Sequence, residues 1–425
     1  MSRFIIIGRQ KIEGALTPVG NKNAALPMLA ASVLTDEPVV LNNMPRIEDV
    51  QVMLALLDDL GVTVEQSGRR VTLCAAGLRK RSLDAQLCRR VRSSILLAGP
   101  MAARHGRVTL YPPGGDVIGR RRVDSHFSGL QGLGVRARIG SRYVLESKAL
   151  RAADILLDEA SVTATENVLM AAVLAPGRTT IFNAACEPHV ADLGALLVKM
   201  GARIEGLGTN RITVRGVRRL RGARHRISPD YIEIGSYMAA AAVTGGKLNA
   251  GPVSGPPCLP VMARVFDELG APWIRDGKSV VYKPRSRLTI RRDIGSAIPK
   301  IEDGPWPSFP SDLLGVALVM ATQAKGTALF FEKMFESRLY FVDQLIGMGA
   351  RIVQCDPHRV LVDGPSRLHG AHMASPDIRA GMALIVAALC ARGESVIENA
   401  QIIDRGYEAV DERLRALGAK IERVE

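Results

Sequence analysis

The sequence predicts an α/β (α+β) fold of two domains in which sheets enclose buried helices. Three observations support this: the length of the chain, a short phrase that recurs six times, and a second recurring phrase that forms very apolar helices. The chain has 425 residues, a length at which two or three domains are usual. Hydrophobic residues make up 47% but aromatic residues only 4%, so we expect aliphatic cores.

The first recurring phrase is the end of a helix, a Leu-Gly or Met-Gly pair, and an alternating strand, as in "LLDDLGVTVEQ" and "LLVKMGARIEG". A glycine directly after a helix is the expected C-terminal cap, because it adopts a left-handed conformation at little cost. The glycines are Gly61, Gly134, Gly201, Gly270, Gly349 and Gly418. Successive copies lie 67 to 79 residues apart, so the chain contains six units.

The second phrase is a helix rich in Ala, Leu, Met and Val, then a polar turn and a β-branched strand. "ENVLMAAVLAPGRTTIFNAA" and "MALIVAALCARGESVIENAQ" are two of its copies. A helix that is apolar on nearly all sides is buried. Three such units could close around a common core, with candidate linkers at 18–22 and 226–236. A solenoid is disfavoured, since its repeats are usually about 20–50 residues long.

Charge, cysteines and hydropathy narrow the class of protein. The net charge of +14 favours anionic ligands. The six cysteines form no CxxC pair and have no zinc-ligand spacing, so we expect a cytoplasmic protein with no metal and no other cofactor. No apolar run is long enough for a membrane helix, so we expect no membrane association. The basic range 211–226 lacks interleaved aromatic residues, which argues against nucleic acid as a partner.

Short polar patches precede the buried helices. Such residues are often simple N-caps, because Ser, Asp and Asn are preferred there. Cations at these positions oppose the helix dipole unless an anion lies beside them. The patches therefore predict a strongly anionic ligand, with a phosphate and a carboxylate. Their residues include Lys22, Asn23, Arg92, Ser161, Asp230, Asp312, Asp377 and Arg379.

A loop at 112–126, "PPGGDVIGRRRVDSH", adds a second charged feature. It presents one carboxylate, Asp116, four residues before the first of three consecutive arginines that include Arg121. Asp124 and His126 follow, and His126 could support Asp124. Arginines in this number could hold an anion while the acid acts on it.

Seven stretches together resemble the UDP-N-acetylglucosamine 1-carboxyvinyltransferase family of enolpyruvyl transferases. They are "GNKNAALP", "PGGDVIGRRRVDSH", "SVTATEN", "FPSDL", "FESR", "DIRAG" and "IDRGYE". The resemblance implies a two-domain inside-out α/β barrel of six βαβαββ units, three per domain. It implies one domain at 22–230 that carries a mobile loop at 112–126. It implies a second domain at 1–21 and 231–425, with the active site in the cleft between the two.

The resemblance also implies a reaction. The enolpyruvyl group of phosphoenolpyruvate moves to the 3-hydroxyl of UDP-N-acetylglucosamine and phosphate leaves, the first committed step of peptidoglycan synthesis, with roles in cell shape and cell division. Asp312 would be the general base. Phosphoenolpyruvate would lie among Lys22, Asn23, Arg92, Arg121, Arg379 and Arg405, and the resemblance makes Lys22 and Arg405 catalytic residues as well. The sugar nucleotide would contact Arg121, Val123, Asp124, Ser161, Val162, Asp312 and Met334.

Asp116 stands at a loop position where many family members carry cysteine and others carry aspartate. The resemblance implies a general-acid role for it and insensitivity to fosfomycin, whose epoxide is opened by a thiolate. Glu159, Arg122, Cys186 and Tyr231 depart from residues common in the family. They leave open an enolpyruvyl transferase for another nucleotide, as in nucleoside-antibiotic pathways. We expect a monomer or weak homo-oligomer whose partners are its two substrates.

Overall fold

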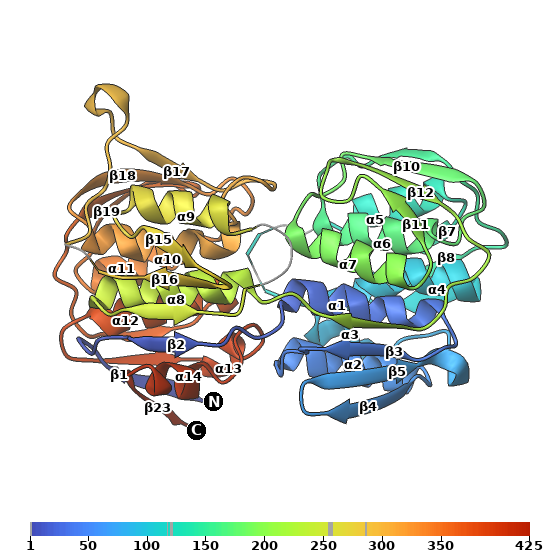
Figure 1. Cartoon of the computed structure of the whole chain (residues 1–425), viewed down its shortest axis with the longest axis horizontal. Helices are drawn as coiled ribbons and strands as arrows, with labels where there is room; N and C mark the ends of the chain where they lie inside the picture. The colour runs from blue at the N-terminus through green and yellow to red at the C-terminus, as the bar shows by residue number, and fades with distance from the viewer. Residues whose placement is uncertain (1, 117, 120–121, 254–257, 285–286) are drawn as a thin grey trace. The chain divides into compact units, whose positions relative to one another are not determined.

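The computed structural model describes residues 2–116, 118–119, 122–253, 258–284 and 287–425 (Figure 1). The chain divides into two compact units. Unit 1 comprises Met1–Pro18, Asp116–Arg121 and Pro229–Glu425. Unit 2 comprises Val19–Gly115 and Arg122–Ser228. Both ends of the chain therefore belong to unit 1.

Unit 2 contains three sheets, with strand orders β13-β3-β5-β4, β6-β8-β7 and β11-β12-β10-β9, as far as the residues described reach. Its strands are β3 (Val39–Asn42), β4 (Thr63–Ser67), β5 (Arg70–Cys74), β6 (Arg107–Leu110), β7 (Arg136–Ile139), β8 (Tyr143–Glu146), β9 (Asp154–Leu156), β10 (Arg178–Phe182), β11 (Arg203–Glu205), β12 (Arg211–Arg215) and β13 (Ala223–Arg226). Its helices are α1 (Lys22–Ala31), η1 (Ser32–Leu34), α2 (Glu48–Asp59), η2 (Ala75–Gly77), α3 (Ala85–Arg90), η3 (Arg92–Leu97), α4 (Ala98–His105), α5 (Asp124–Gly132), α6 (Val162–Ala172) and α7 (Pro188–Lys199).

Unit 1 also contains three sheets within the described part of the chain, with strand orders β21-β22-β1-β23, β15-β16-β14-β2 and β17-β18-β20-β19. Its strands are β1 (Arg3–Ile7), β2 (Gly14–Leu16), β14 (Leu248–Ala250), β15 (Trp273–Asp276), β16 (Ser279–Tyr282), β17 (Lys300–Glu302), β18 (Gly326–Phe331), β19 (Arg351–Asp356), β20 (Arg359–Gly364), β21 (His372–Ala374), β22 (Glu394–Glu398) and β23 (Lys420–Val424). Its helices are α8 (Tyr231–Thr244), α9 (Leu259–Glu268), η4 (Ile294–Ser296), α10 (Ser311–Gln323), α11 (Val342–Gly347), α12 (Ile378–Cys390), α13 (Ala400–Ile403) and α14 (Val410–Ala416).

One strand arrangement recurs in these sheets. In the sheet built on β10, strand β9 lies parallel to β10, β12 pairs antiparallel with β10, and β11 pairs antiparallel with β12. The order along the chain is β9, α6, β10, α7, β11, β12, which is one βαβαββ unit. In the three-stranded sheet an isolated parallel bridge from Ser82 to Thr109 takes the place of the first strand. The six sequence repeats thus correspond to six copies of one topology.

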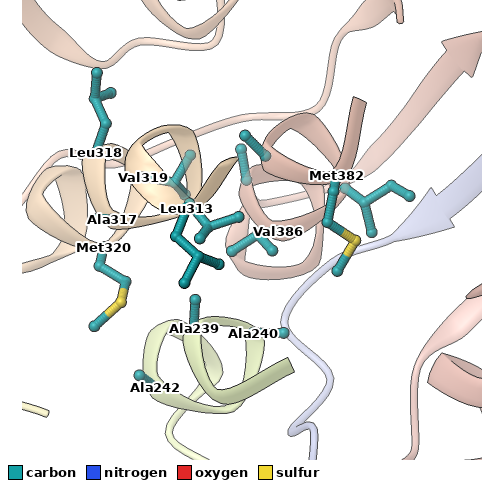
Figure 2. Close-up of a cluster of buried hydrophobic side chains, with 14 of the residues drawn as sticks. Ala239, Ala240, Ala242, Leu313, Ala317, Leu318, Val319, Met320, Met382 and Val386 are labelled. Carbon is teal, nitrogen blue, oxygen red and sulfur yellow. The ribbon is translucent and has the colours of Figure 1, made fainter. Parts of the chain in front are cut away.

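The core of unit 1 is a bundle of the three apolar helices α8, α10 and α12 (Figure 2). Figure 2 shows Ala239 of α8, Leu313 of α10 and Val386 of α12 close together at their contact, and all three side chains are fully buried. Each helix also packs on a sheet: α8 on β14, α10 on β20 and α12 on β1. Replacing Leu313 by alanine would cost about 2–5 kcal/mol, since the packed bundle cannot collapse into the cavity. The predicted α/β class and its buried helices are confirmed.

The predicted glycine caps are also present. Gly61, Gly134, Gly201, Gly270, Gly349 and Gly418 all have φ between 82° and 105°. Each follows a helix and turns the chain into the next strand. A side chain here would be strained, because L-residues rarely adopt positive φ.

Two expectations need correction. The sheets of the described residues are separate, so they enclose helices without joining into a closed barrel. The second apolar segment, expected as one buried helix, is split into η3 and α4. Pro100 favours the split, because proline lacks an N–H and fits best in the first turn of a helix, where α4 places it.

Candidate functional site

A polar cluster lies at the N-terminal ends of α10 and α12 in unit 1. Its centre is Asp312, in the first turn of α10. Nη2 of Arg338 donates to one carboxylate oxygen at 3.0 Å, and Nη2 of Arg379 lies 2.9 Å from the other. Asp312 is 25% exposed, whereas the two arginine side chains are only 6% and 7% exposed. The arginines therefore orient a carboxylate that solvent can still reach.

Arg338 connects this cluster to Asp377. Its Nη1 atom lies 3.7 Å from the Asp377 carboxylate, which caps α12 by accepting the N–H groups of Arg379 and Ala380. Burial raises the pKa of Asp377, and the charge of Arg338 opposes that shift. Sequence reasoning did not select Arg338, although it ends the quoted stretch "FESR". Asp377 is an N-cap, as Ser, Asp and Asn often are, whereas Asp312 binds side chains instead.

Arg379 is held in place but keeps one donor available. Its guanidinium carbon lies 5.2 Å from the centre of the Tyr407 ring, and the Tyr407 hydroxyl bonds Ser236 Oγ at 2.8 Å. Burial lowers the pKa of Arg379, but the charges of Asp312 and Tyr407 outweigh it, so the pKa rises. Its buried Nη1 atom has no acceptor in the described part of the protein. Because an unsatisfied buried donor is costly, this atom suits an anionic ligand.

Asp116 pairs with Arg405 in the same unit. Nη1 of Arg405 donates to the Asp116 carboxylate at 2.7 Å, and the two side chains are 18% and 13% exposed. The next turn of the loop also contacts unit 1, where the Ser337 N–H donates to the Ile118 carbonyl at 3.2 Å. The charge of Asp116 contributes to the raised pKa of Asp377. The loop acid therefore lies in the electrostatic surroundings of the Asp312 cluster.

Met334 lies close to these groups along the chain, in the segment 332–338 that ends at Arg338. Its side chain is 39% exposed. Its backbone N–H donates to Glu332 at 3.1 Å. Arg121, expected near both substrates, lies outside the described residues.

In unit 2, Lys22 is the first residue of α1 and pairs with a carboxylate. Its Nζ atom lies 2.7 Å from Asp49, in the first turn of α2, and both side chains are at most 10% exposed. Asn21 caps the helix by accepting the Ala24 N–H at 2.9 Å. Asn23 is half-buried beside Lys22. Asp49 offsets the unfavourable interaction of a cation with the helix N-terminus.

Arg92 starts the 3-10 helix η3 rather than an α-helix. Its Nη2 atom donates to the Arg122 carbonyl at 3.0 Å. Arg122 in turn donates from Nε to Asp124, the first residue of α5, at 2.8 Å. Val123 is the residue immediately before that helix. Arg92 is thus tied to the segment that carries two of the expected nucleotide-binding residues.

The start of α6 holds two more of the expected nucleotide-binding residues. Ser161 is the N-cap and accepts the Ala164 N–H at 3.4 Å, and Val162 is the first helical residue. The neighbouring Thr163 bonds His126 Nε2 at 3.0 Å. Ser125 Oγ, in α5, donates to Asp158 at 2.5 Å and also lies 3.2 Å from a carboxylate oxygen of Glu159.

His126 has a structural role in unit 2. Its other ring nitrogen, Nδ1, bonds Asn167 at 2.7 Å, so neither nitrogen is left for Asp124. The suggested support of Asp124 is therefore wrong. Burial, helped by the charge of Arg92, lowers the pKa of His126 to about 3. The ring is neutral and links α5 to α6.

Within the described residues there is no group of three or more side chains that could hold a metal ion. None of the described helices has the length and apolarity needed to cross a membrane.

The expected site residues form two sets. Unit 1 holds Asp116, Asp312, Met334, Arg379 and Arg405. Unit 2 holds Lys22, Asn23, Arg92, Val123, Asp124, Ser161 and Val162.

Comparison with known proteins first defines a class. A sequence model of the EPSP synthase (3-phosphoshikimate 1-carboxyvinyltransferase) family matches residues 6–414. The enolpyruvyl transferase NikO from Streptomyces tendae has the same fold, with a TM-score of 0.87, 23% identity, and coverage of 100% of this chain and 99% of NikO. EPSP synthase from Acinetobacter baumannii gives a TM-score of 0.78 at 18% identity, with 100% of both chains covered. The class is that of the carboxyvinyltransferases.

Sequence relatives are more specific. UDP-N-acetylglucosamine 1-carboxyvinyltransferase from Treponema denticola is 50% identical over 99% of both chains. The enzyme of that name from Bradyrhizobium diazoefficiens is 50% identical over 99% of this chain and 98% of its own length. The one from Borreliella burgdorferi is 48% identical over 100% of this chain and 99% of its own. Within the EPSP synthase family, the chain belongs to the UDP-N-acetylglucosamine 1-carboxyvinyltransferases.

Proposed function

We propose that this protein transfers the enolpyruvyl group of phosphoenolpyruvate to the 3-hydroxyl of UDP-N-acetylglucosamine and releases phosphate. The observation that carries the proposal is 50% identity over 99% of the chain to an enzyme named for that acceptor. The alternative, another nucleotide as acceptor, gains no support from the enolpyruvyl transferase NikO, which shares the fold but only 23% of the sequence. The first committed step of peptidoglycan synthesis is thus the proposed role, with its consequences for cell shape and division.

The donor carries a phosphate and a carboxylate, and both need cations. We assign this task to Lys22, Arg92, Arg121, Arg379 and Arg405, with Asn23 beside Lys22. The buried Nη1 atom of Arg379 supports the assignment, because no described protein group accepts its hydrogen bond. Because these residues come from both units, we further propose that the active site lies in a cleft between the domains at 22–230 and at 1–21 with 231–425.

For the acceptor, we assign proton removal from the sugar hydroxyl to Asp312. Its carboxylate is fixed by Arg338 and Arg379 yet remains open to solvent, as a general base requires. Val123, Asp124, Ser161, Val162, Met334 and Arg121 are assigned to the uridine and sugar. The N-terminus of α6, beside Ser161, offers backbone N–H groups suited to a diphosphate.

Asp116 is proposed as the general acid of a mobile loop at 112–126. In this structure its carboxylate forms an ion pair with Arg405 at 2.7 Å. Arg405 is one of the cations that we assign to the donor. A donor anion that binds Arg405 would therefore compete with Asp116 and release it towards the reacting carbon. Separated from this cation, the Asp116 carboxylate would first take up a proton from solvent and could then deliver it to the reacting carbon, so donor binding would be coupled to proton delivery.

Because an aspartate replaces the usual cysteine, we expect the enzyme to resist fosfomycin. A carboxylate is a weaker nucleophile than a thiolate towards the epoxide ring. Asp116→Cys should become sensitive while keeping part of its activity, and its pH–rate profile should move upward, because a thiol has a pKa near 8.5 and a carboxyl about 4. Peptide mass spectrometry locates any adduct. Rapid labelling of the unmodified protein by fosfomycin would overturn the assignment.

We also propose a cytoplasmic location for the protein. All six cysteines are free thiols, which suits the reducing cytoplasm. We propose a monomer or weak homo-oligomer that needs no cofactor, with its two substrates as its partners.

The decisive experiment is phosphate release with phosphoenolpyruvate and a panel of acceptors: UDP-N-acetylglucosamine, other uridine nucleotides and shikimate 3-phosphate. Among these acceptors, only UDP-N-acetylglucosamine is expected to support phosphate release, and strong preference for another acceptor would refute the proposal.

Lys22→Met and Arg405→Ala should each lower phosphate release at least about 100-fold, since losing one partner of a desolvated charge pair costs about 3–5 kcal/mol. Arg264→Ala is the control, because Arg264 is 80% exposed on α9.

A further inference from the structure

A second pair of acids lies behind the Asp312 cluster, where two parallel strands end. In the β17–β18 pair, Glu302 is opposite Phe331. The next residues are Asp303 and Glu332, whose side chains are 1% and 0% exposed. Two carboxyl groups have thus been removed from water at the same edge of one sheet.

Glu332 holds together the segment that leads to Arg338. One of its carboxyl oxygens accepts the backbone N–H groups of Met334 and Phe335, both at 3.1 Å. Ser311 Oγ, at the start of α10 and next to Asp312, donates to the same carboxyl group at 2.9–3.0 Å. Glu332 therefore links the segment 332–338 to the helix that carries Asp312.

Asp303 completes the arrangement from β17. One of its oxygens accepts the Lys333 N–H at 2.6 Å. Its other oxygen is buried and receives no N–H or O–H donor from the described residues. Asp303 is nevertheless within hydrogen-bonding reach of the Glu332 carboxyl. Two ionised carboxylates cannot form a hydrogen bond, so a bond between them requires a proton.

The charged neighbours do not remove this need. Burial and the nearby Asp303 raise the pKa of Glu332, and Arg338 and the Ser311 hydroxyl oppose them only in part. The ammonium group of Lys333 lies 2.9 Å from Glu302, on the outer side of the strands. The His358 ring contacts the backbone carbonyl of Glu332 at 2.8 Å, not its carboxyl group.

We propose that Asp303 and Glu332 share one proton and act as positioning residues, which hold the segment 332–338 and the start of α10 so that Arg338 orients Asp312. The positioning role rests on the proposed function of Asp312. The shared proton itself does not, and it can be tested without any substrate.

The first test is the pH dependence of unfolding by urea. A folded acid that keeps its proton while the unfolded chain loses it makes stability fall as pH rises above the acid's ordinary range, near pH 4–5. The equilibrium constant for unfolding of the wild type should rise up to about tenfold per pH unit relative to that of Glu332→Gln, whose amide carries permanent hydrogens. Equal slopes for the two proteins would overturn the shared proton.

Glu302→Gln is the matched control. Glu302 is one residue before Asp303, and hydrogen bonds from Lys300 and Lys333 lower its pKa. The effect of Glu302 on the pH dependence of stability therefore has the opposite sign. Glu302 adds stability at pH values above the ordinary titration range of a glutamate. Glu302→Gln should keep the wild-type decline with rising pH or steepen it slightly. A flattened slope in this control would show that the effect is not specific to the buried pair.

The second test is turnover. Glu332→Ala removes the links to Met334, Phe335 and Ser311, and should lower kcat about 10–100-fold with a small change in KM for phosphoenolpyruvate. Glu332→Gln keeps an acceptor for those groups and a donor for Asp303, so it should restore most of kcat. If Gln impairs kcat as much as Ala at equal stability, the positioning role is wrong. If wild type shows no transfer at all, the proposed function fails while the urea result still stands.

Discussion

Asp312 combines two properties at the scale of a single residue: fixed orientation and access to solvent. Arg338 and Arg379 supply the first, and its 25% exposure supplies the second. Asp312 and Arg379 could be selected from the sequence because cations and acids cluster before the apolar helices. Their partners could not be predicted. Arg338 follows a separate strand, and only the packing of β18 beside α10 brings its guanidinium to Asp312.

Replacement of Asp312 tests the base directly. Asp312→Asn should slow turnover roughly 10²–10⁴-fold, because an amide cannot accept the proton, while KM for the nucleotide sugar changes little. Steady-state phosphate release measures both constants. Asp343→Asn is a suitable control, since Asp343 also lies in a helical first turn but is exposed. Unchanged turnover in Asp312→Asn would refute the assignment.

His126 should make unit 2 sensitive to acid. Its pKa is lowered to about 3 in the folded protein, whereas an unfolded histidine titrates near 6.5. The unfolded chain therefore binds the extra proton first, and stability is lost as pH falls from about 6.5 towards 3, by up to about 1.4 kcal/mol per pH unit. Urea unfolding of wild type and His126→Gln between pH 4 and 7 measures this.

The exposed His372, beside Glu398, provides the comparison for that experiment. His372→Gln should retain the wild-type loss of stability in acid, because burial and not histidine itself causes the shift. A parallel decline in wild type and His126→Gln would contradict the role given to His126.

At the scale of elements, the sequence pattern predicted the structure correctly where a single physical preference decided it. All-apolar stretches became buried helices, and the six glycines became helix caps because no other residue adopts that conformation as readily. It failed where two rules competed, as at Pro100, which splits one apolar stretch into η3 and α4. The Asp303–Glu332 pair was also missed. It exists only because β17 and β18 are in parallel register.

The start of α8 provides a test at this scale. Asp230 caps the helix by accepting the N–H groups of Ile232 and Glu233 at 2.8 and 3.2 Å. Asp230→Ala should lower the free energy of unfolding by about 0.5–2 kcal/mol, and Asp230→Asn by much less, because asparagine caps nearly as well. Chemical denaturation measures both. Equal losses in the two variants would point to the charge of Asp230 instead of its cap.

At the scale of the whole molecule, the proposed site draws residues from both units. If both units hold the same ligands, they should approach when the nucleotide sugar binds, because the ligand's negative charge offsets repulsion between the cations of the two sets. Small-angle scattering should then show a smaller radius of gyration at saturating UDP-N-acetylglucosamine. No change in wild type would argue against closure.

The pairing of β1 has a consequence for how the protein is made. Strand β1 lies between β22 and β23, with Arg3 opposite Val424. A ribosome releases β1 first and must then reach β22 at Glu394, which takes roughly 20–80 s at about 5–20 residues per second. Until then the alternating strand, with Phe4 and Ile6 on its apolar side, has no partner and is open to aggregation.

That delay follows from gene order and not from the fold. Because Arg3 lies opposite Val424 in an antiparallel pair, a short turn could join the end of β23 to the start of β1. A circularly permuted gene that encodes residues 1–18 after residue 425 would make these strands in immediate succession. The nascent chain would then complete the sheet β21-β22-β1-β23 as a hairpin, without waiting for about nine-tenths of its own synthesis.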